Sequence, residues 1–95
     1  MQEDCLFCEY EKFDLVGEND LSFAIRDKFP VTESHTLILS KSHHQTVFDL
    51  PPTELISIFE LAKTCREKIV KDDFTVQGFN FGSNSGAAAG QKIPH

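Results

Sequence analysis

An amphipathic stretch from Thr53 to about Lys71 constrains the fold more than any other part of this chain of 95 residues. Its apolar residues recur at spacings of three and four, which is the period of an α-helix with one apolar face. These residues are Leu55, Ile58, Phe59, Ala62, Cys65 and Ile69. The pattern predicts one long amphipathic helix, in which Cys65 is a core thiol rather than a nucleophile or a ligand.

Three further segments have the composition of β-strands. Leu21 to Asp27 alternates apolar and polar residues, and His35 to Lys41 is a second β-rich run. The short polar connection between these two favours antiparallel pairing. Phe74 to Phe81 alternates loosely and predicts another strand, interrupted at Gly78. Gly17 to Asp20 is typical of a turn. We therefore expect an α+β fold, in which one long helix accompanies an antiparallel sheet.

The composition fits a single small globular domain spanning residues 1–95, since 40% of the residues are hydrophobic and nine are Phe. The net charge of −6 argues against a nucleic-acid polymer as partner. The acidic start is unlike a signal peptide, and no apolar stretch has the length of a membrane helix. The three cysteines fit a reducing compartment, so we expect a cytoplasmic protein without a membrane partner.

Cys5 and Cys8 form a C-x-x-C pair near the start of the chain. Two thiolates at this spacing can bind one zinc ion, although a closed site needs two further ligands. Two cysteines without a shared role are the second interpretation. A redox pair is the third, because such a pair normally lies between a strand and a helix.

The segment from Gly86 to Gln91 has two glycines that bracket three alanines. Glycine permits positive φ and close approach of another group to the backbone. Such a segment suits a loop whose N–H groups surround an anion such as phosphate. A flexible Gly/Ala linker has the same composition.

Several motifs occur in one order along the chain and together cover nearly all of it. They are the C-x-x-C pair, Ile25-Arg26-Asp27-Lys28-Phe29-Pro30, His35-Thr36-Leu37-Ile38, Lys41-Ser42-His43, Asp49-Leu50 before the helix, Ser83-Asn84-Ser85-Gly86, and Gly90-Gln91-x-x-x-His95. In this order they closely resemble the histidine triad (HIT) family of nucleotide hydrolases and transferases. The resemblance implies a HIT-like α+β domain with an antiparallel sheet and one long helix.

The resemblance implies a role for each matching residue in nucleotide binding. Asp27 matches the carboxylate that accepts hydrogen bonds from the ribose hydroxyls, as an acceptor-only group can. Ile25 and Phe29 would line the base pocket, and Asn84 would lie beside the α-phosphate. The loop formed by Gly90 and Gln91 would hold the phosphate and the leaving or attacking group. Without the resemblance, the same residues read as turn or core positions.

The implied chemistry is attack by a histidine on the α-phosphate of a purine nucleotide conjugate, either a phosphoramidate or a dinucleoside polyphosphate. The resulting nucleotidyl-histidine is then hydrolysed or passed to an acceptor. His95 matches the first, supporting histidine of His-x-His-x-His, and the nucleophile would lie two residues further on. We therefore expect a domain that is incomplete at its C-terminus and inactive as it stands, whose full-length form is a homodimeric enzyme. The alternative is a non-catalytic nucleotide-binding or zinc-stabilised module.

Cysteine-bearing members of the family bind a structural zinc ion, and the resemblance implies the same site in this chain. Its ligands here would be Cys5, Cys8, His43 and His95, a complete tetrahedral donor set. His44 is the rival of His43, and register with the family favours His43.

Overall fold

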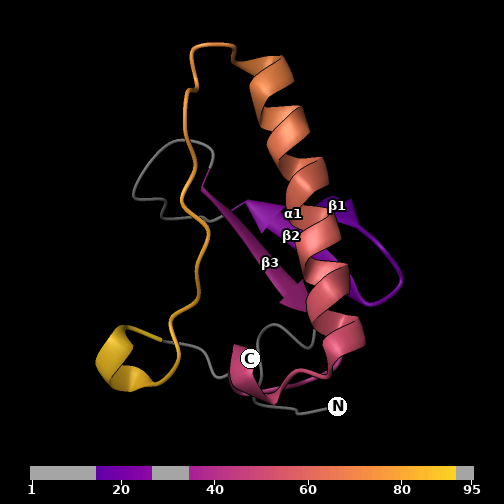
Figure 1. Cartoon of the computed structure of the whole chain (residues 1–95), viewed down its shortest axis with the longest axis vertical. Helices are drawn as coiled ribbons and strands as arrows, with labels where there is room; N and C mark the ends of the chain where they lie inside the picture. The colour runs from indigo at the N-terminus through magenta and orange to yellow at the C-terminus, as the bar shows by residue number, and fades with distance from the viewer. Residues whose placement is uncertain (1–14, 27–34, 92–95) are drawn as a thin grey trace.

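The computed structural model describes residues 15–26 and 35–91, and every structural statement below concerns those residues. They form a sheet of three strands, one long helix and two short 3₁₀ turns (Figure 1). In chain order the elements are β1 (Leu15–Glu18), β2 (Ser22–Arg26), β3 (Thr36–Ser40), η2 (Val47–Asp49), α1 (Pro52–Asp72) and η3 (Ala87–Ala89). The α+β class predicted from the sequence is confirmed.

The sheet has the order β1-β2-β3, and both pairs of neighbours are antiparallel. The pairing of β2 with β3 runs in regular register from Ser22 opposite Ser40 to Arg26 opposite Thr36. This confirms the two predicted strands and their antiparallel relation. It also makes β2 the central strand, with a hydrogen-bonded neighbour on either side.

Strand β2 is buried on both of its faces. Phe23 and Ile25 point to one face and form a cluster with Leu39, whereas Ala24 points to the other face and packs with Leu61 and Cys65 of α1. Successive side chains of a strand point to opposite faces. The alternation of this segment therefore does not separate a buried face from a solvated one, and helix α1 covers the face that carries Ala24.

Strand β1 corrects the sequence prediction, which places a turn at Gly17 to Asp20 and no strand before it. In the structure Gly17 lies inside the strand, and the turn begins at Asn19. A Cβ atom at Gly17 would lie 3.1 Å from Cδ1 of Leu61 and 3.6 Å from Sγ of Cys65. The glycine therefore permits a close approach between the strand and the helix. The pairing register also shifts between Leu15 and Gly17, which is the mark of a β-bulge.

Helix α1 is confirmed, with bounds within one residue of the prediction. Pro52 occupies its first turn, where the missing N–H costs nothing. At its other end the N–H of Asp73 donates to the carbonyl of Ile69 at 2.9 Å. None of the helices in the described ranges is long and apolar enough to cross a membrane.

The predicted apolar stripe of α1 is only partly correct. Ile58, Cys65 and Ile69 are buried, but Leu55 and Phe59 are 44% and 50% exposed. Leu61, which the stripe omitted, is 4% exposed and packs against the sheet. The helix thus has two apolar faces. One packs against the sheet, and the other lies toward the segment that follows the helix.

The prediction of a strand from Phe74 to Phe81 is wrong, because this segment contains no β-strand. A strand requires ladder hydrogen bonds to a neighbour, and the described part of the chain supplies none here. The segment instead runs antiparallel to α1 (Figure 1). The rings of Phe81 and Phe59 meet edge to face at 5.9 Å, and the guanidinium of Arg66 lies 5.8 Å from the ring centre of Phe79.

A polar cluster joins the β1–β2 turn to α1. Oδ1 of Asn19 accepts hydrogen bonds from the N–H of Leu21, the N–H and hydroxyl of Ser22, and the hydroxyl of Ser57, at 2.7–3.1 Å. Nδ2 of Asn19 donates to the carbonyl of Ser57 at 3.0 Å. Ser22 is fully buried, so its hydroxyl needs these partners. The cluster places the turn against the helix through polar contacts that complement the apolar ones.

Candidate functional site

The predicted phosphate loop is a closed turn whose shape depends on two glycines. Gly86 has φ 89° and Gly90 has φ 96°, both in the region that residues with a Cβ rarely adopt. Between them η3 forms a single turn. The N–H groups of Ala89 and Gln91 donate to the carbonyl of Gly86, and the N–H of Gly90 donates to the carbonyl of Ala87. The N–H groups of Ala87 and Ala88 make none of these bonds.

Gln91 ties this loop together and connects it to a distant segment. Its Oε1 accepts a hydrogen bond from the N–H of Gly86 at 2.7 Å. Its Nε2 donates to the carbonyl of Gln45, which lies 46 positions earlier in the sequence. In Figure 1 the loop accordingly lies at the same end of the molecule as η2 and the start of α1.

The segment that meets the loop carries both candidate histidines between β3 and η2. His43 and His44 are each half-buried. Nε2 of His44 lies 3.3 Å from Oε1 of Glu54, a residue that is only 8% exposed in the first turn of α1. The side chain of Asp49 accepts from the N–H and the hydroxyl of Thr46, each at 3.3 Å.

Asn84 and Ser85 enter the loop from the segment beside α1. Asn84 is exposed, and its Nδ2 lies 3.7 Å from the point that a Cβ at Gly90 would occupy. Oγ of Ser85 is shielded from solvent without a hydrogen-bond partner among the described residues. A hydroxyl in this state can serve a bound ligand. The sequence signal for it is weak, since a serine beside a glycine is equally typical of a turn.

The structure brings together one part of the predicted site. Asn84, Gly90 and Gln91 form the loop, and it contacts the segment that contains His43. Ile25 is 3% exposed within the core cluster of β2. The other predicted site residues lie outside the described residues; they are Cys5, Cys8, Asp27, Phe29 and His95. Within the described ranges, no three His, Cys, Asp or Glu residues gather closely enough to hold a metal ion.

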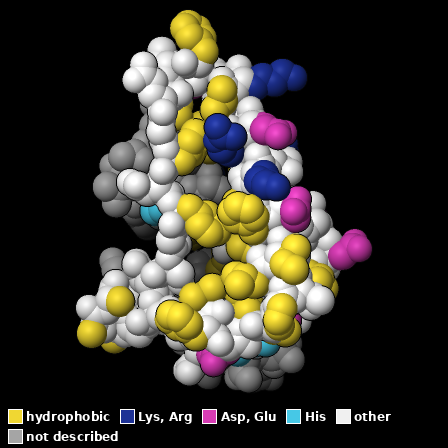
Figure 2. All heavy atoms as spheres, viewed as in Figure 1, with side chains coloured by type: hydrophobic (Ala, Val, Ile, Leu, Met, Phe, Trp, Pro, Cys, Tyr) yellow, Lys and Arg dark blue, Asp and Glu magenta, His cyan; other side chains and the backbone are white. Residues whose placement is uncertain are grey.

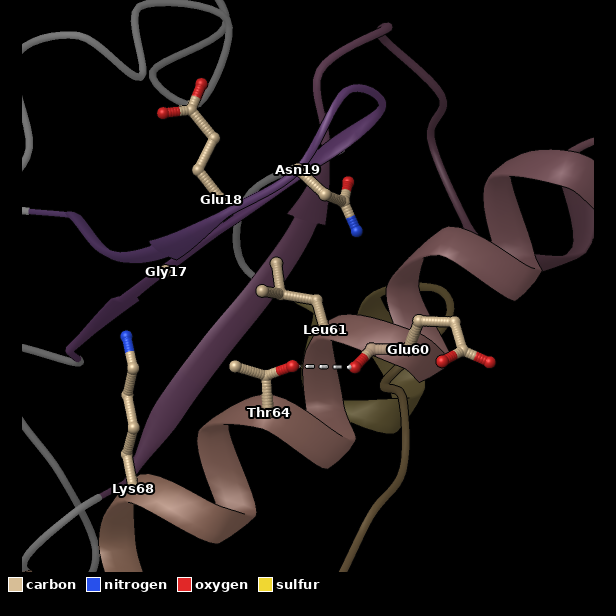
Figure 3. A pocket seen from close by; sticks show the side chains of 7 residues that line it. All are labelled: Gly17, Glu18, Asn19, Glu60, Leu61, Thr64 and Lys68. Carbon is tan, nitrogen blue, oxygen red and sulfur yellow. Dashed lines mark hydrogen bonds between the residues drawn. The ribbon is translucent and has the colours of Figure 1, made fainter.

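A shallow groove of about 270 Å³ lies elsewhere, between β1 and α1 (Figure 3). Its polar atoms are engaged within the protein: Nζ of Lys68 donates to the carbonyl of Val16 at 2.8 Å, and the hydroxyl of Thr64 donates to the carbonyl of Glu60 at 3.3 Å. The groove contains no residue of the loop, and it is a feature of helix–sheet packing.

The thiol of Cys65 lies near this groove. Burial raises the pKa of the Cys65 thiol, and the positive charges of Lys68 and Arg26 partly offset this increase. The raised pKa favours the inert protonated thiol at neutral pH.

The sheet, the helix and the loop together define a small α+β domain with a glycine-bounded turn at one end. The HIT domain family model matches residues 10–95 of the chain. The chain therefore belongs to the HIT family, as the order of its motifs predicted.

Relatives with sequence similarity cover nearly the whole chain. An uncharacterized HIT-like protein of Mycoplasma genitalium is 35% identical over 95 residues, which are 96% of this chain and 67% of that protein. The adenylylsulfatase HINT3 of Arabidopsis thaliana is 32% identical over the full chain and 50% of its own length. The adenosine 5'-monophosphoramidase HNT1 of Saccharomyces cerevisiae is 30% identical over 96% of this chain and 57% of its own. The chain thus spans between half and two thirds of these relatives.

Solved structures share the fold. A HIT family protein from Bacillus anthracis superposes with a TM-score of 0.89 at 31% identity, over 100% of this chain and 70% of its own. A zinc-bound histidine triad family protein from Mycobacterium smegmatis superposes with a TM-score of 0.85 at 25% identity, over 97% of this chain and 69% of its own.

The left-handed conformation of Gly90 generates a prediction about the loop. We expect Gly90→Ala to destabilise the turn by about 1–2 kcal/mol, because a Cβ is strained at this φ. Hydrogen exchange of the Gly90 and Gln91 amide protons should accelerate by roughly tenfold. Gly82→Ala is the matched control, since a Cβ there meets nothing within 4 Å and its φ is not in the strained range. Equal exchange rates in both variants would contradict the loop geometry.

Proposed function

We propose that this protein binds a purine nucleotide at the loop 84–91, as part of a HIT site for hydrolysis or transfer at the α-phosphate. The observation that carries the proposal is the turn between Gly86 and Gly90, with the amide of Asn84 beside it. Its N–H groups at Ala87 and Ala88 are not used within the turn, and the hydroxyl of Ser85 lacks a partner among the described residues. These groups are donors, which suit phosphate oxygens.

The substrate class follows from the resemblance and from the relatives. HINT3 and HNT1 are named for action on an adenylyl sulfate and an adenosine phosphoramidate, so we propose an adenosine-containing phosphoramidate, or a dinucleoside polyphosphate, as the class of substrate. Asp27 would accept hydrogen bonds from the ribose hydroxyls, and Ile25 with Phe29 would flank the base. His95 would support a nucleophilic histidine two positions beyond it. Donors held in place before the reaction would stabilise charge on the phosphoryl oxygens.

Asn84→Ala tests where the phosphate binds. We expect this variant to weaken AMP binding roughly three- to tenfold, the effect of one lost hydrogen bond, and to leave adenosine binding unchanged. Asn80→Ala is the matched control, because Asn80 is exposed on the same segment but outside the loop. Isothermal titration of both ligands measures the effect. If wild-type protein binds neither ligand at millimolar concentration, the nucleotide proposal fails.

We further propose that zinc is bound by Cys5, Cys8, His43 and His95, in the manner that the resemblance implies. Two thiolates and two imidazoles suit zinc and form a closed structural set. Nε2 of His44 already contacts Oε1 of Glu54. This contact supports His43, rather than His44, as the histidine ligand of this segment. Such an ion would join the segment before β1 to the segment after the loop.

His43→Ala and His44→Ala separate the two histidines. The His43 variant should lose bound zinc and melt at a lower temperature, because the metal contributes folding free energy, whereas the His44 variant should retain the metal. The zinc-to-protein ratio, measured by mass spectrometry of the purified protein, reports the outcome. Zinc retained in the His43 variant and lost in the His44 variant would reverse the assignment.

The second apolar face of α1 supports the homodimer that the resemblance implies. Hydrophobic side chains gather along this face, between the helix and the segment after it (Figure 2). Ile56, Phe59 and Phe81 are 61%, 50% and 64% exposed there. We propose that a second copy of the chain covers them, because an apolar surface of this kind is typical of obligate interfaces.

Phe59→Glu tests this interface. A charge at this position should convert the dimer to a monomer, because it cannot be desolvated without a partner. Sedimentation velocity measures the change. Phe74→Glu is the control, since Phe74 is 89% exposed beyond the end of α1. A monomeric wild-type protein would refute the homodimer.

A further inference from the structure

We propose that Glu54 and His44 act as a positioning pair, which sets the geometry of the phosphate loop through Gln45 and Gln91. The proposal rests on the nucleotide-binding function proposed above and adds to it a group that is remote from the ligand. The path runs from the start of α1, through the segment after β3, to the loop at Gly86. Each step is a hydrogen bond or a peptide link between described residues.

The first step joins the helix to the histidine. Glu54 is the one acidic residue of the first turn of α1, and it is buried to 8% exposure. A buried carboxylate is costly unless it is hydrogen-bonded, and Nε2 of His44 lies 3.3 Å from its Oε1. A carboxylate can only accept, so the ring nitrogen is the donor. This contact fixes the side chain of His44 against a rigid helix.

The second step transmits this position to a backbone carbonyl. Gln45 lies between two anchored residues: His44 is held by Glu54, and Thr46 is held by the carboxylate of Asp49. With both neighbours held, the Gln45 carbonyl has less freedom to reorient. That carbonyl is the acceptor for Nε2 of Gln91.

The third step reaches the loop. The side-chain amide of Gln91 is planar, so its contact with Gln45 through Nε2 also sets the direction of its Oε1. Oε1 accepts from the N–H of Gly86 at 2.7 Å, which is the residue where φ becomes positive and the turn begins. A displaced Gln45 carbonyl would therefore loosen the turn that presents the donors. Preorganised donors of this kind depend on such supporting contacts.

The first arm of the test needs no ligand. In ¹H–¹⁵N spectra, we expect Glu54→Ala and His44→Ala to shift the backbone amide of Gly86 and the side-chain amide of Gln91. His44→Gln should largely restore both resonances, because its amide can still donate to Glu54. Glu60→Ala is the matched control from the same helix, since its side chain is 61% exposed and its ion pair with Lys63, at 3.9 Å, lies on the helix surface away from His44. A merely structural role would lower the melting temperature without moving these two resonances, and that result would overturn the proposal.

The second arm measures AMP binding by the same variants. We expect Glu54→Ala and His44→Ala each to weaken AMP binding roughly three- to tenfold, with the double variant no weaker than the worse single one, because both act on one path. Glu54→Gln keeps an acceptor oxygen and should therefore bind AMP nearly as wild type, and if Glu54→Ala does not fold, His44→Ala and His44→Gln carry the test. Unchanged AMP affinity in both single variants would overturn the proposal. If the variants shift these resonances but the wild-type protein does not bind AMP, the positioning role of Glu54 and His44 is supported and the proposed nucleotide function is rejected.

Discussion

The close approach of Leu61 to the backbone of Gly17 determines how α1 sits on the sheet. A Cβ at Gly17 would lie 3.1 Å from the leucine methyl, so a larger residue here would require that methyl to shift by a few tenths of an ångström. The next nearest atoms to this point belong to small side chains, Sγ of Cys65 on the helix at 3.6 Å and Cβ of Ala24 on β2 at 3.8 Å. The larger side chains Phe23 and Leu39 lie on the opposite face. Because the helix is held this closely, its first turn and the segment before it have defined positions, and the loop at Gly86 depends on both.

The spacing of apolar residues along the chain predicts the elements that have a regular apolar pattern of their own. The helix and the strands that became β2 and β3 each contain enough repeats to be recognised alone. The sequence predicts a turn at Gly17 because glycine is typical both of turns and of close contacts between backbones and side chains, and only the position of Leu61 in the folded protein distinguishes the two. Leu55 and Phe59 have the spacing of core residues, but in the structure they lie on a second apolar face of the helix and are about half exposed. The Phe74–Phe81 prediction failed since a strand is defined by its partner, which no single segment reveals.

The candidate site divides along similar lines. The composition from Gly86 to Gln91 predicts a loop but fits a flexible linker equally well, and the positive φ angles of Gly86 and Gly90 in the structure decide for a closed turn. The contact of Gln91 with Gln45 could not be predicted, since it joins residues 46 positions apart through a backbone carbonyl that any residue would supply. The pairing of His44 with Glu54 is equally a product of tertiary structure. Membership of the HIT family is established by the match over residues 10–95, and it connects these local features to one class of chemistry.

The order β1-β2-β3 of the sheet is also the order of the strands along the chain, and α1 follows directly. Each strand is therefore followed along the chain by its neighbour in the sheet, and closing the loops between the strands costs little conformational entropy. We expect the sheet and helix to form rapidly, before the residues of the phosphate loop are in place. The loop then docks onto a surface that already exists, at the carbonyl of Gln45. The last event in forming the site would then be the capture of that one glutamine side chain, after the core has assembled.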